Sequence, residues 1–180
     1  MKNKKQLIEE LEARAQGIQD PSLREFVQRM LEIAPDAFYN LPTTKGVHPK
    51  DEHGKHGVLL HTIRVVDLAL IIADAADMSV EDLDNLTAAA ILHDTCYYGP
   101  LVESPTPMIE HHLLVRKMAE LLGKFLDYSP FERVFEIIET HMGRRFEPPF
   151  TPTVSLKGAL HLADCICSVW SGKAPYQRRR

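Results

Sequence analysis

The chain has 180 residues, 44% of them hydrophobic, with 21 basic against 25 acidic residues and a formal net charge of −4. This length suits one domain, residues 1–180, that buries roughly 70% of the surface exposed in the unfolded chain. The slight acidic excess argues against general nucleic-acid binding. Because the sequence shows neither a signal peptide nor the roughly 20 apolar residues of a membrane span, we expect a cytoplasmic protein without membrane contact.

Two helices are predicted at the N-terminus. Residues 4–16 carry apolar side chains at helical spacing. The pair Asp20-Pro21 supplies an N-cap and a first-turn proline for a second helix, which runs through Ile33. We therefore expect residues 1–40 to form a helical hairpin.

A loop and two helices are predicted next. Residues 41–57 are rich in Gly, Pro and charged residues, which predicts a long loop, and loops of that length often carry function. The apolar run over residues 58–76 predicts a largely buried helix. Ser79 then begins another apolar helix with a pattern that resembles a capping box, and this helix ends in the doublet His93-Asp94.

Three helices are predicted in the second half of the chain. They cover about residues 108–126, 130–142 and 153–170, with proline-rich breaks between them. No segment alternates as a strand does, so the predicted fold is all-α. We expect a helical core over residues 57–170 and a flexible tail over residues 171–180.

The doublet His93-Asp94 indicates metal chemistry. A carboxylate beside an imidazole at the end of an apolar helix needs a cation, hydrogen bonds or solvent, and Asp is rarely buried without a partner. Imidazole suits Fe, Mn, Co, Ni and Zn, while a carboxylate can bridge two ions. Other His and Asp residues also fall near helix ends or within apolar helices. The candidate ligands are His61, His93, Asp94, His111, His112, His141 and Asp164.

Single members of this set also fit simpler explanations. His61 alone fits a hydrogen-bonded core histidine, and His141 alone fits a histidine favoured by the dipole at a helix C-terminus. Adjacent helical residues point about 100° apart, so one of His111 and His112 is expected to coordinate while the other supports it. The sequence leaves this choice open.

In this order, the residues resemble the HD-domain metal-dependent phosphohydrolase superfamily. The segment that ends in His61 resembles its first-ligand helix, His93-Asp94 its signature doublet, and Asp164 its terminal ligand. Members with two further histidines hold two metals, and His141 with His111 or His112 resembles that pair. The resemblance implies a helical HD domain, one or two divalent ions (Fe, Mn, Co, Ni, Zn or Mg), and a catalytic role for His93 and a bridging Asp94.

The sequence departs from this family pattern in two places. Many two-metal members continue the doublet with a glycine and a phosphate-contacting lysine, whereas this chain continues from Thr95 to Gly99 without one. Met142 stands where some members have another histidine. That residue argues against a three-metal site and against the cyclic-dinucleotide phosphodiesterase branch.

An anionic substrate needs positive charge near these ligands, and aromatic rings there could contact it as well. The candidates are Arg144, Arg145, Lys55, Tyr97 and Tyr98, although solvation and ordinary loop packing explain them as well. His48, His53 and His56 lie in the polar loop and are expected to be solvated. His161, one turn before Asp164, is expected to approach the metals or to hydrogen-bond a ligand carboxylate.

The leading functional hypothesis is hydrolysis of a small phosphate ester or nucleotide by a metal-activated water. Two alternatives stay open. A minority of the superfamily uses a di-iron pair on the same residue types as an oxygenase, and the absent lysine is consistent with a non-catalytic nucleotide-binding regulatory module. No nucleic-acid partner is expected, and a homodimer is compatible with the sequence.

Overall fold

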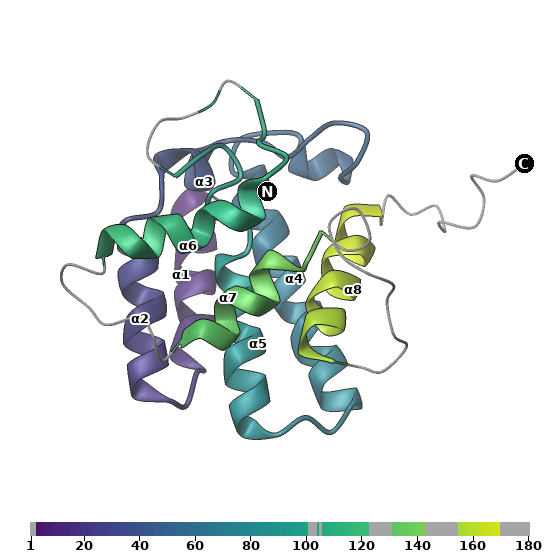
Figure 1. Ribbon diagram of the computed structural model, residues 1–180. Coiled ribbons are helices and arrows are strands. Elements are labelled where there is room, and N and C mark those ends of the chain that lie inside the picture. Colours follow the sequence, from purple (N-terminus) through teal and green to yellow (C-terminus); the bar gives the residue numbers. More distant parts are fainter. Residues whose placement is uncertain (1–2, 101–103, 105, 123–130, 143–154, 170–180) are drawn as a thin grey trace, which may run out of the picture.

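The computed structural model describes residues 3–100, 104, 106–122, 131–142 and 155–169. Throughout this part of the chain the regular secondary structure is helical, as predicted (Figure 1). The elements are α1 (Lys4–Gln16), α2 (Pro21–Glu32), α3 (Asp36–Asn40), the 3-10 turn η1 (Lys50–Glu52), α4 (Gly57–Ala75), α5 (Val80–Leu92), α6 (His111–Leu122), α7 (Glu132–Glu139) and α8 (Leu156–Val169).

Helices α1 and α2 form the predicted N-terminal hairpin, and side chains cap both. Asn3 and Gln6 accept hydrogen bonds from each other's backbone N–H groups, which makes a capping box at the start of α1. Asp20 accepts from two backbone N–H groups in the first turn of α2, which begins at Pro21. The cap and the proline thus set the start of α2 where the sequence predicts it.

A buried carboxylate fastens the turn between α1 and α2 to α5. Asp84 is 5% exposed and accepts hydrogen bonds from the backbone N–H groups of Gln19 and Asp20, the shortest at 2.8 Å. Because Asp84→Ala removes the acceptor, we expect it to lower the free energy of unfolding by about 1–3 kcal/mol. Urea unfolding measures this loss. The neighbouring substitution Asn85→Ala is the control, expected to change stability by about 0.5 kcal/mol or less, and equal losses in the two variants would contradict the assignment.

Helices α4 and α5 form the centre of the bundle (Figure 1). Helix α4 contacts α1, α3, α5 and α8, and α5 contacts α2, α7 and α8. The Ser79 side chain accepts a hydrogen bond from the backbone N–H of Asp82, so α5 starts at the predicted cap. Helix α5 ends at Leu92, and His93 and Asp94 lie in the turn that follows. Both side chains are buried there.

Helix α6 begins later, and helix α7 ends earlier, than the sequence predicts. Helix α6 begins at His111 rather than near residue 108, and residues 123–130 lie outside the described part of the chain. Helix α7 ends at Glu139, so His141 lies in a turn after the helix instead of within it. His111 therefore stands at a helix start and His141 just past a helix end, where backbone carbonyls are available as hydrogen-bond acceptors.

The loop between α3 and α4 packs onto the start of α4. A Cβ added to Gly57 would come 1.8 Å from the backbone oxygen of Glu52, so only glycine allows this close approach. On its other side the loop is tied to the segment after the doublet, because the Tyr98 hydroxyl donates a hydrogen bond to the Pro42 carbonyl at 2.8 Å. The loop therefore forms a fixed wall next to His93 and Asp94.

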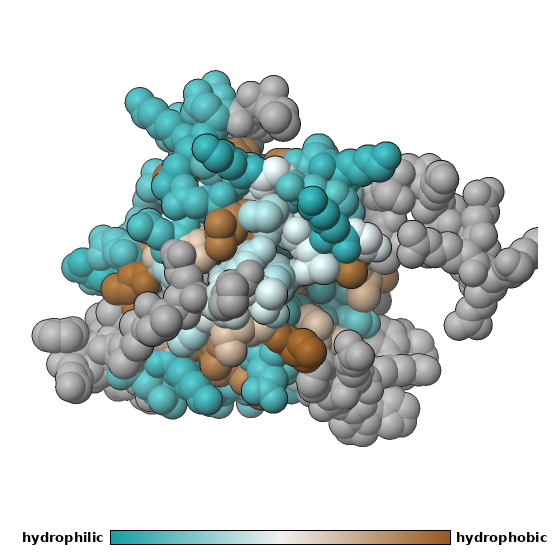
Figure 2. Space-filling view, turned by 90° about the horizontal axis from the view of Figure 1, so that it is seen from above, coloured by the Kyte–Doolittle hydropathy of each residue, from teal (hydrophilic) through white to brown (hydrophobic). Residues whose placement is uncertain are grey.

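No described helix combines the length and apolar character needed to cross a membrane. Seen from above, the surface is mainly hydrophilic or intermediate in hydropathy, and apolar side chains appear in small separate groups (Figure 2). Large apolar side chains that are exposed include Ile71, Ile109 and Leu162, which lie in different parts of the chain.

Candidate metal centre

Three histidines of the site are held in the same way, by hydrogen bonds within their own turns. The Nδ1–H groups of His93, His111 and His141 donate to the carbonyl oxygen three residues earlier, at 2.8, 2.6 and 2.6 Å. A carbonyl can only accept, so these bonds place a proton on Nδ1 and direct Nε2 away from the backbone. Such bonds are typical of metal-binding histidines, because they fix the ring before a metal arrives.

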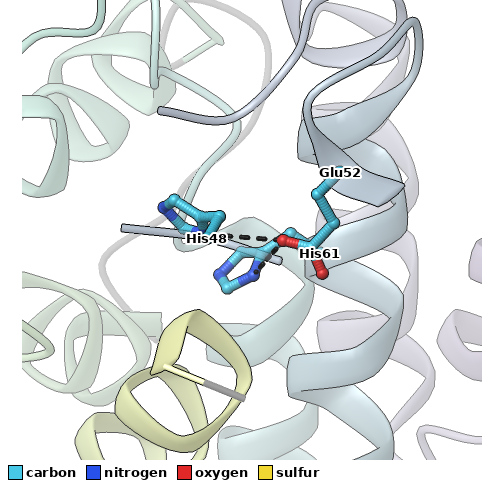
Figure 3. A group of neighbouring side chains, drawn as sticks. All are labelled: His48, Glu52 and His61. Atoms are coloured by element: carbon cyan, nitrogen blue, oxygen red, sulfur yellow. Dashed lines mark ion pairs between the residues drawn. The ribbon is translucent and has the colours of Figure 1, made fainter. Parts of the chain in front are cut away.

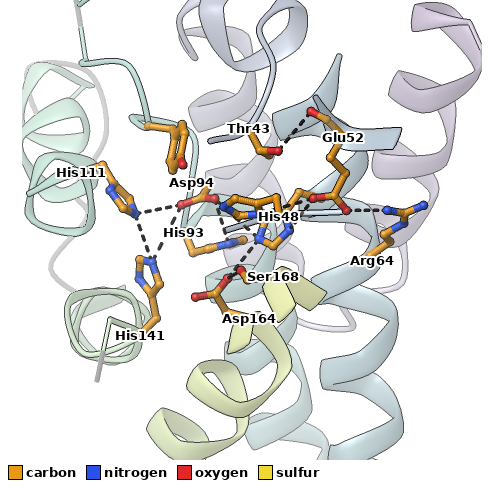
Figure 4. Close-up of polar contacts among 12 residues, drawn as sticks. Thr43, His48, Glu52, Arg64, His93, Asp94, His111, His141, Asp164 and Ser168 are labelled. Atoms are coloured by element: carbon orange, nitrogen blue, oxygen red, sulfur yellow. Dashed lines mark hydrogen bonds and ion pairs between the residues drawn. The ribbon is translucent and has the colours of Figure 1, made fainter. Parts of the chain in front are cut away.

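Asp94 lies between these rings and turns one oxygen toward each side (Figure 4). Its Oδ1 is 3.0 Å from Nε2 of His111 and 3.9 Å from Nε2 of His141. Its Oδ2 is 3.4 Å from Nε2 of His93 and 3.8 Å from Nε2 of His61. One carboxylate thus faces four imidazole nitrogens, two through each oxygen.

The ligand candidates fall into two sets on the two sides of Asp94. The α8-side set consists of His61 on α4, His93, and Asp164 on α8, whose Oδ1 lies 3.0 Å from Nε2 of His61. The α6-side set consists of His111 at the start of α6 and His141 after α7, with 3.3 Å between their Nε2 atoms. Four segments, distant in sequence from the doublet, therefore converge on His93 and Asp94.

Without a metal, protons balance the charge of the carboxylates. Although burial disfavours its charged form, hydrogen bonds with Asp164 and Glu52 raise the pKa of His61 to about 10. Burial likewise opposes the charged form of His111, but its hydrogen bond to Asp94 raises its pKa. Burial would raise the pKa of Asp94, yet His93 and His111 hold it well below its usual range. The ionised form of Asp94 and the protonated forms of His61 and His111 therefore favour one another.

The residues present fit a divalent transition metal. The Nε2 atom of His93 is buried and has no hydrogen-bond partner among the described residues, which is costly unless something binds there. Burial, followed by the charge of His93, lowers the pKa of His141 to about 3, so that ring is neutral and its nitrogen can coordinate. Clustered imidazole nitrogens and carboxylate oxygens are the donors that Fe, Mn, Co, Ni and Zn accept.

Metal binding is expected to release protons. Nε2 of His61 lies 3.0 Å from Asp164 and Nε2 of His111 lies 3.0 Å from Asp94; because a carboxylate only accepts, coordination must displace the proton on each Nε2. We expect at least one proton per chain, that of His61, to be released near pH 7, and an affinity for zinc that rises with pH up to about pH 10, the pKa of His61. Titration calorimetry in buffers of different ionisation enthalpy measures the release. A binding heat that does not depend on the buffer would contradict this expectation.

Of the two adjacent histidines, the structure turns His111 toward Asp94. His112 is 1% exposed, with its ring centroid 6.0 Å from that of His141, and it belongs to neither group of potential ligand atoms around Asp94. Burial and the nearby His111 lower its pKa. His111 is thus the better candidate ligand, and His112 packs behind the α6-side set.

The tyrosines predicted to contact substrate lie beside the centre and also brace the loop. Tyr97 packs its ring 5.1 Å from that of His111, and its hydroxyl lies 2.6 Å from that of Thr44. Tyr98 donates its hydroxyl proton to the loop backbone. Lys55 is exposed in the same loop. The remaining two predicted substrate contacts, Arg144 and Arg145, lie outside the described residues.

The sequence analysis missed two residues whose buried side chains lie beside the centre, His48 and Glu52. The polar loop predicts a solvated His48, and this is wrong: its side chain is 6% exposed, with Nδ1 3.4 Å from Oε2 of Glu52. Glu52 itself is fully buried and lies against His61. The Nδ1–H of His161 donates to the backbone oxygen of His141 at 2.6 Å, which connects this ring to the turn that carries His141.

Comparison with known proteins identifies the family. A protein-family model described as HD domain matches residues 58–168. Comparisons with curated proteins and with solved structures found no match. The matched segment includes Asp94 and every residue of the two ligand sets. Since it covers more than half of the 180 residues, the chain belongs to the HD domain family.

Proposed function

We propose that this protein is a metal-dependent phosphohydrolase that acts on a small phosphate ester or nucleotide. The observation that carries the proposal is the orientation of Asp94, whose two oxygens each face a different ligand set. A carboxylate in this position can bridge two ions, and paired ions roughly 3.5–4 Å apart are common in phosphatases and nucleases. Membership of the HD domain family supports the same class of reaction.

The chain's own residues prepare the site for this chemistry. The α8-side set would hold one ion and the α6-side set the other, with Asp94 shared between them. Bound divalent ions supply Lewis acidity toward a phosphoryl oxygen and lower the pKa of a water toward neutrality. The backbone hydrogen bonds of His93, His111 and His141 keep the rings in place, so little reorganisation is needed when substrate binds.

The negative charge of a phosphate also needs partners beyond the ligands. We propose Arg144 and Arg145 for this role because they follow His141 closely in sequence, and Lys55 because it is an exposed cation in the wall beside the centre. Tyr97 and Tyr98 would supply an aromatic face beside the centre that can stack on a nucleobase. A small anionic substrate fits these contacts.

The test is metal-dependent phosphate release. The purified protein is loaded in turn with Mg, Mn, Fe, Co, Ni or Zn and given para-nitrophenyl phosphate and a panel of nucleoside phosphates. We expect release with at least one metal, and its loss after chelation and dialysis. If the loaded protein releases nothing from the whole panel but still binds a nucleotide, the non-catalytic module replaces this proposal.

A di-iron oxygenase is the second candidate, because four histidines and two aspartates also suit a pair of iron ions. The two candidates differ in metal use and in what they consume. Activity that requires iron and consumes O2 would favour the oxygenase. Phosphate release by a protein loaded only with Mg or Mn would exclude it, since neither of these ions supplies the redox chemistry of iron.

A further inference from the structure

Glu52 is a fully buried carboxylate that belongs to neither ligand set but lies against His61 of the α8-side set (Figure 3). Its Oε1 accepts a hydrogen bond from the guanidinium of Arg64 at 2.5 Å, which compensates its charge. Its backbone oxygen accepts from the N–H and the hydroxyl of Thr43, which fixes the turn that carries it. Glu52 is therefore fixed both through its carboxylate and through its backbone.

The other carboxylate oxygen of Glu52 faces two imidazole rings. Oε2 lies 3.3 Å from Nδ1 of His61 and 3.4 Å from Nδ1 of His48. None of these three buried atoms has a hydrogen-bond partner among the described residues, so these ion-pair contacts are the polar contacts that they make there. The contact with Glu52 is thus what compensates the buried Nδ1 atom of His61.

His61 needs such a partner because of its place in the fold. The other three histidine candidates lie at helix ends, where each donates Nδ1–H to a backbone carbonyl of its own turn. His61 lies inside α4, where backbone carbonyls accept the hydrogen bonds of the helix. Its ring must therefore be oriented by a group from elsewhere, and the loop before α4 brings Glu52 to that position.

We propose that Glu52 is the positioning residue that orients His61 for metal binding, with its carboxylate replacing the backbone carbonyls that orient the other three histidines. A carboxylate on Nδ1 fixes the ring and strengthens Nε2 as a metal ligand, an effect usually worth 10–100-fold in metal affinity. The proposal rests on metal binding at the α8-side set, and it does not depend on which reaction follows.

The cluster His48–Glu52–His61 also has the composition of a metal site in its own right. However, His61 would then have to bind one metal through Nδ1 and another through Nε2, which requires a doubly deprotonated ring. The charge of Glu52 is moreover already compensated by Arg64. The support of His61 is therefore the assignment that the geometry favours.

Zinc affinity of the full chain, measured by competition with a chromophoric chelator, tests the proposal. We expect Glu52→Gln to weaken zinc binding about 10-fold and Glu52→Ala about 100-fold. Asp51→Asn is the matched control, because Asp51 shares Arg64 with Glu52 but is half exposed and contacts neither histidine. We expect Asp51→Asn to bind zinc within about twofold of the unaltered protein. Circular dichroism of the metal-free variants verifies the fold, and the isosteric Gln variant decides the result if the Ala variant unfolds.

The same measurement contains the outcomes that would overturn the proposal. If Glu52→Gln binds zinc as tightly as Asp51→Asn does, Glu52 does not position His61. His48→Ala leaves the contact between Glu52 and His61 in place, so its zinc stoichiometry should equal that of the unaltered protein. A loss of one zinc per chain in His48→Ala would instead identify the cluster as a separate metal site. If the unaltered protein binds zinc but releases no phosphate, the proposed function fails while this inference stands.

Discussion

Asp94→Asn is expected to eliminate nearly all phosphate release. The substitution keeps the shape of the side chain but removes its charge and replaces one oxygen by an amide nitrogen, so the group that faces both ligand sets can no longer bridge them. Losing metal-based stabilisation of several kcal/mol corresponds to a fall in kcat/KM on the order of 10³-fold. Initial rates of phosphate release under saturating metal measure it.

The control for this prediction is Asp67→Asn, which removes a half-exposed aspartate of α4 that pairs with Arg14 away from the centre. We expect its rates to stay within about twofold of those of the unaltered protein, as is usual for surface changes. Substantial phosphate release from correctly folded Asp94→Asn would show that the reaction does not use the bridging carboxylate.

His111→Ala is expected to remove the second metal-binding event, whereas His112→Ala is expected to leave it in place. The Nε2 atom of His111 lies 3.0 Å from Asp94 and 3.3 Å from His141, while His112 packs behind this pair. Deleting a ligand should cost more than the 10–100-fold typical of supporting groups, so we expect at least about 100-fold weaker binding of the second zinc in His111→Ala. Stepwise zinc titration resolves the two events.

The adjacent pair makes this a matched comparison, because both histidines are buried and both variants create similar cavities. Thermal unfolding of the metal-free variants separates a loss of stability from a loss of metal binding. Should His112→Ala lose the second zinc and His111→Ala keep it, the orientation of α6 described above would be wrong.

Most of the helices could be predicted because their signals are local. Caps and apolar spacing act within a few residues, and Asp20 and Ser79 mark the starts of α2 and α5 in both sequence and structure. The short helix α3 was not predicted, since it has no side-chain cap and is too short to show a period. It forms where Ala37 and Phe38 are buried, next to α4, and such tertiary contacts leave no local pattern.

The ligand candidates could be predicted because His and Asp residues rarely occur together within apolar helices or at their ends. The groups around them could not. Glu52 and His48 lie in a loop without periodicity, and their burial comes from the packing of that loop on Gly57 and its tie to Tyr98. Similarly, the sequence shows that His111 and His112 point in different directions, but it does not show which of them faces the other ligand candidates. The packing of α6 against α7 turns His111 toward Asp94.

The metal-to-chain ratio most directly tests the claim that Asp94 joins two metal sites. Elemental analysis of protein purified without chelators and then loaded with zinc gives this ratio, with His141→Ala as the comparison because it removes one ring of the α6-side set. We predict a ratio near two for the unaltered protein and near one for His141→Ala. A ratio near one in both proteins would contradict the two-metal centre.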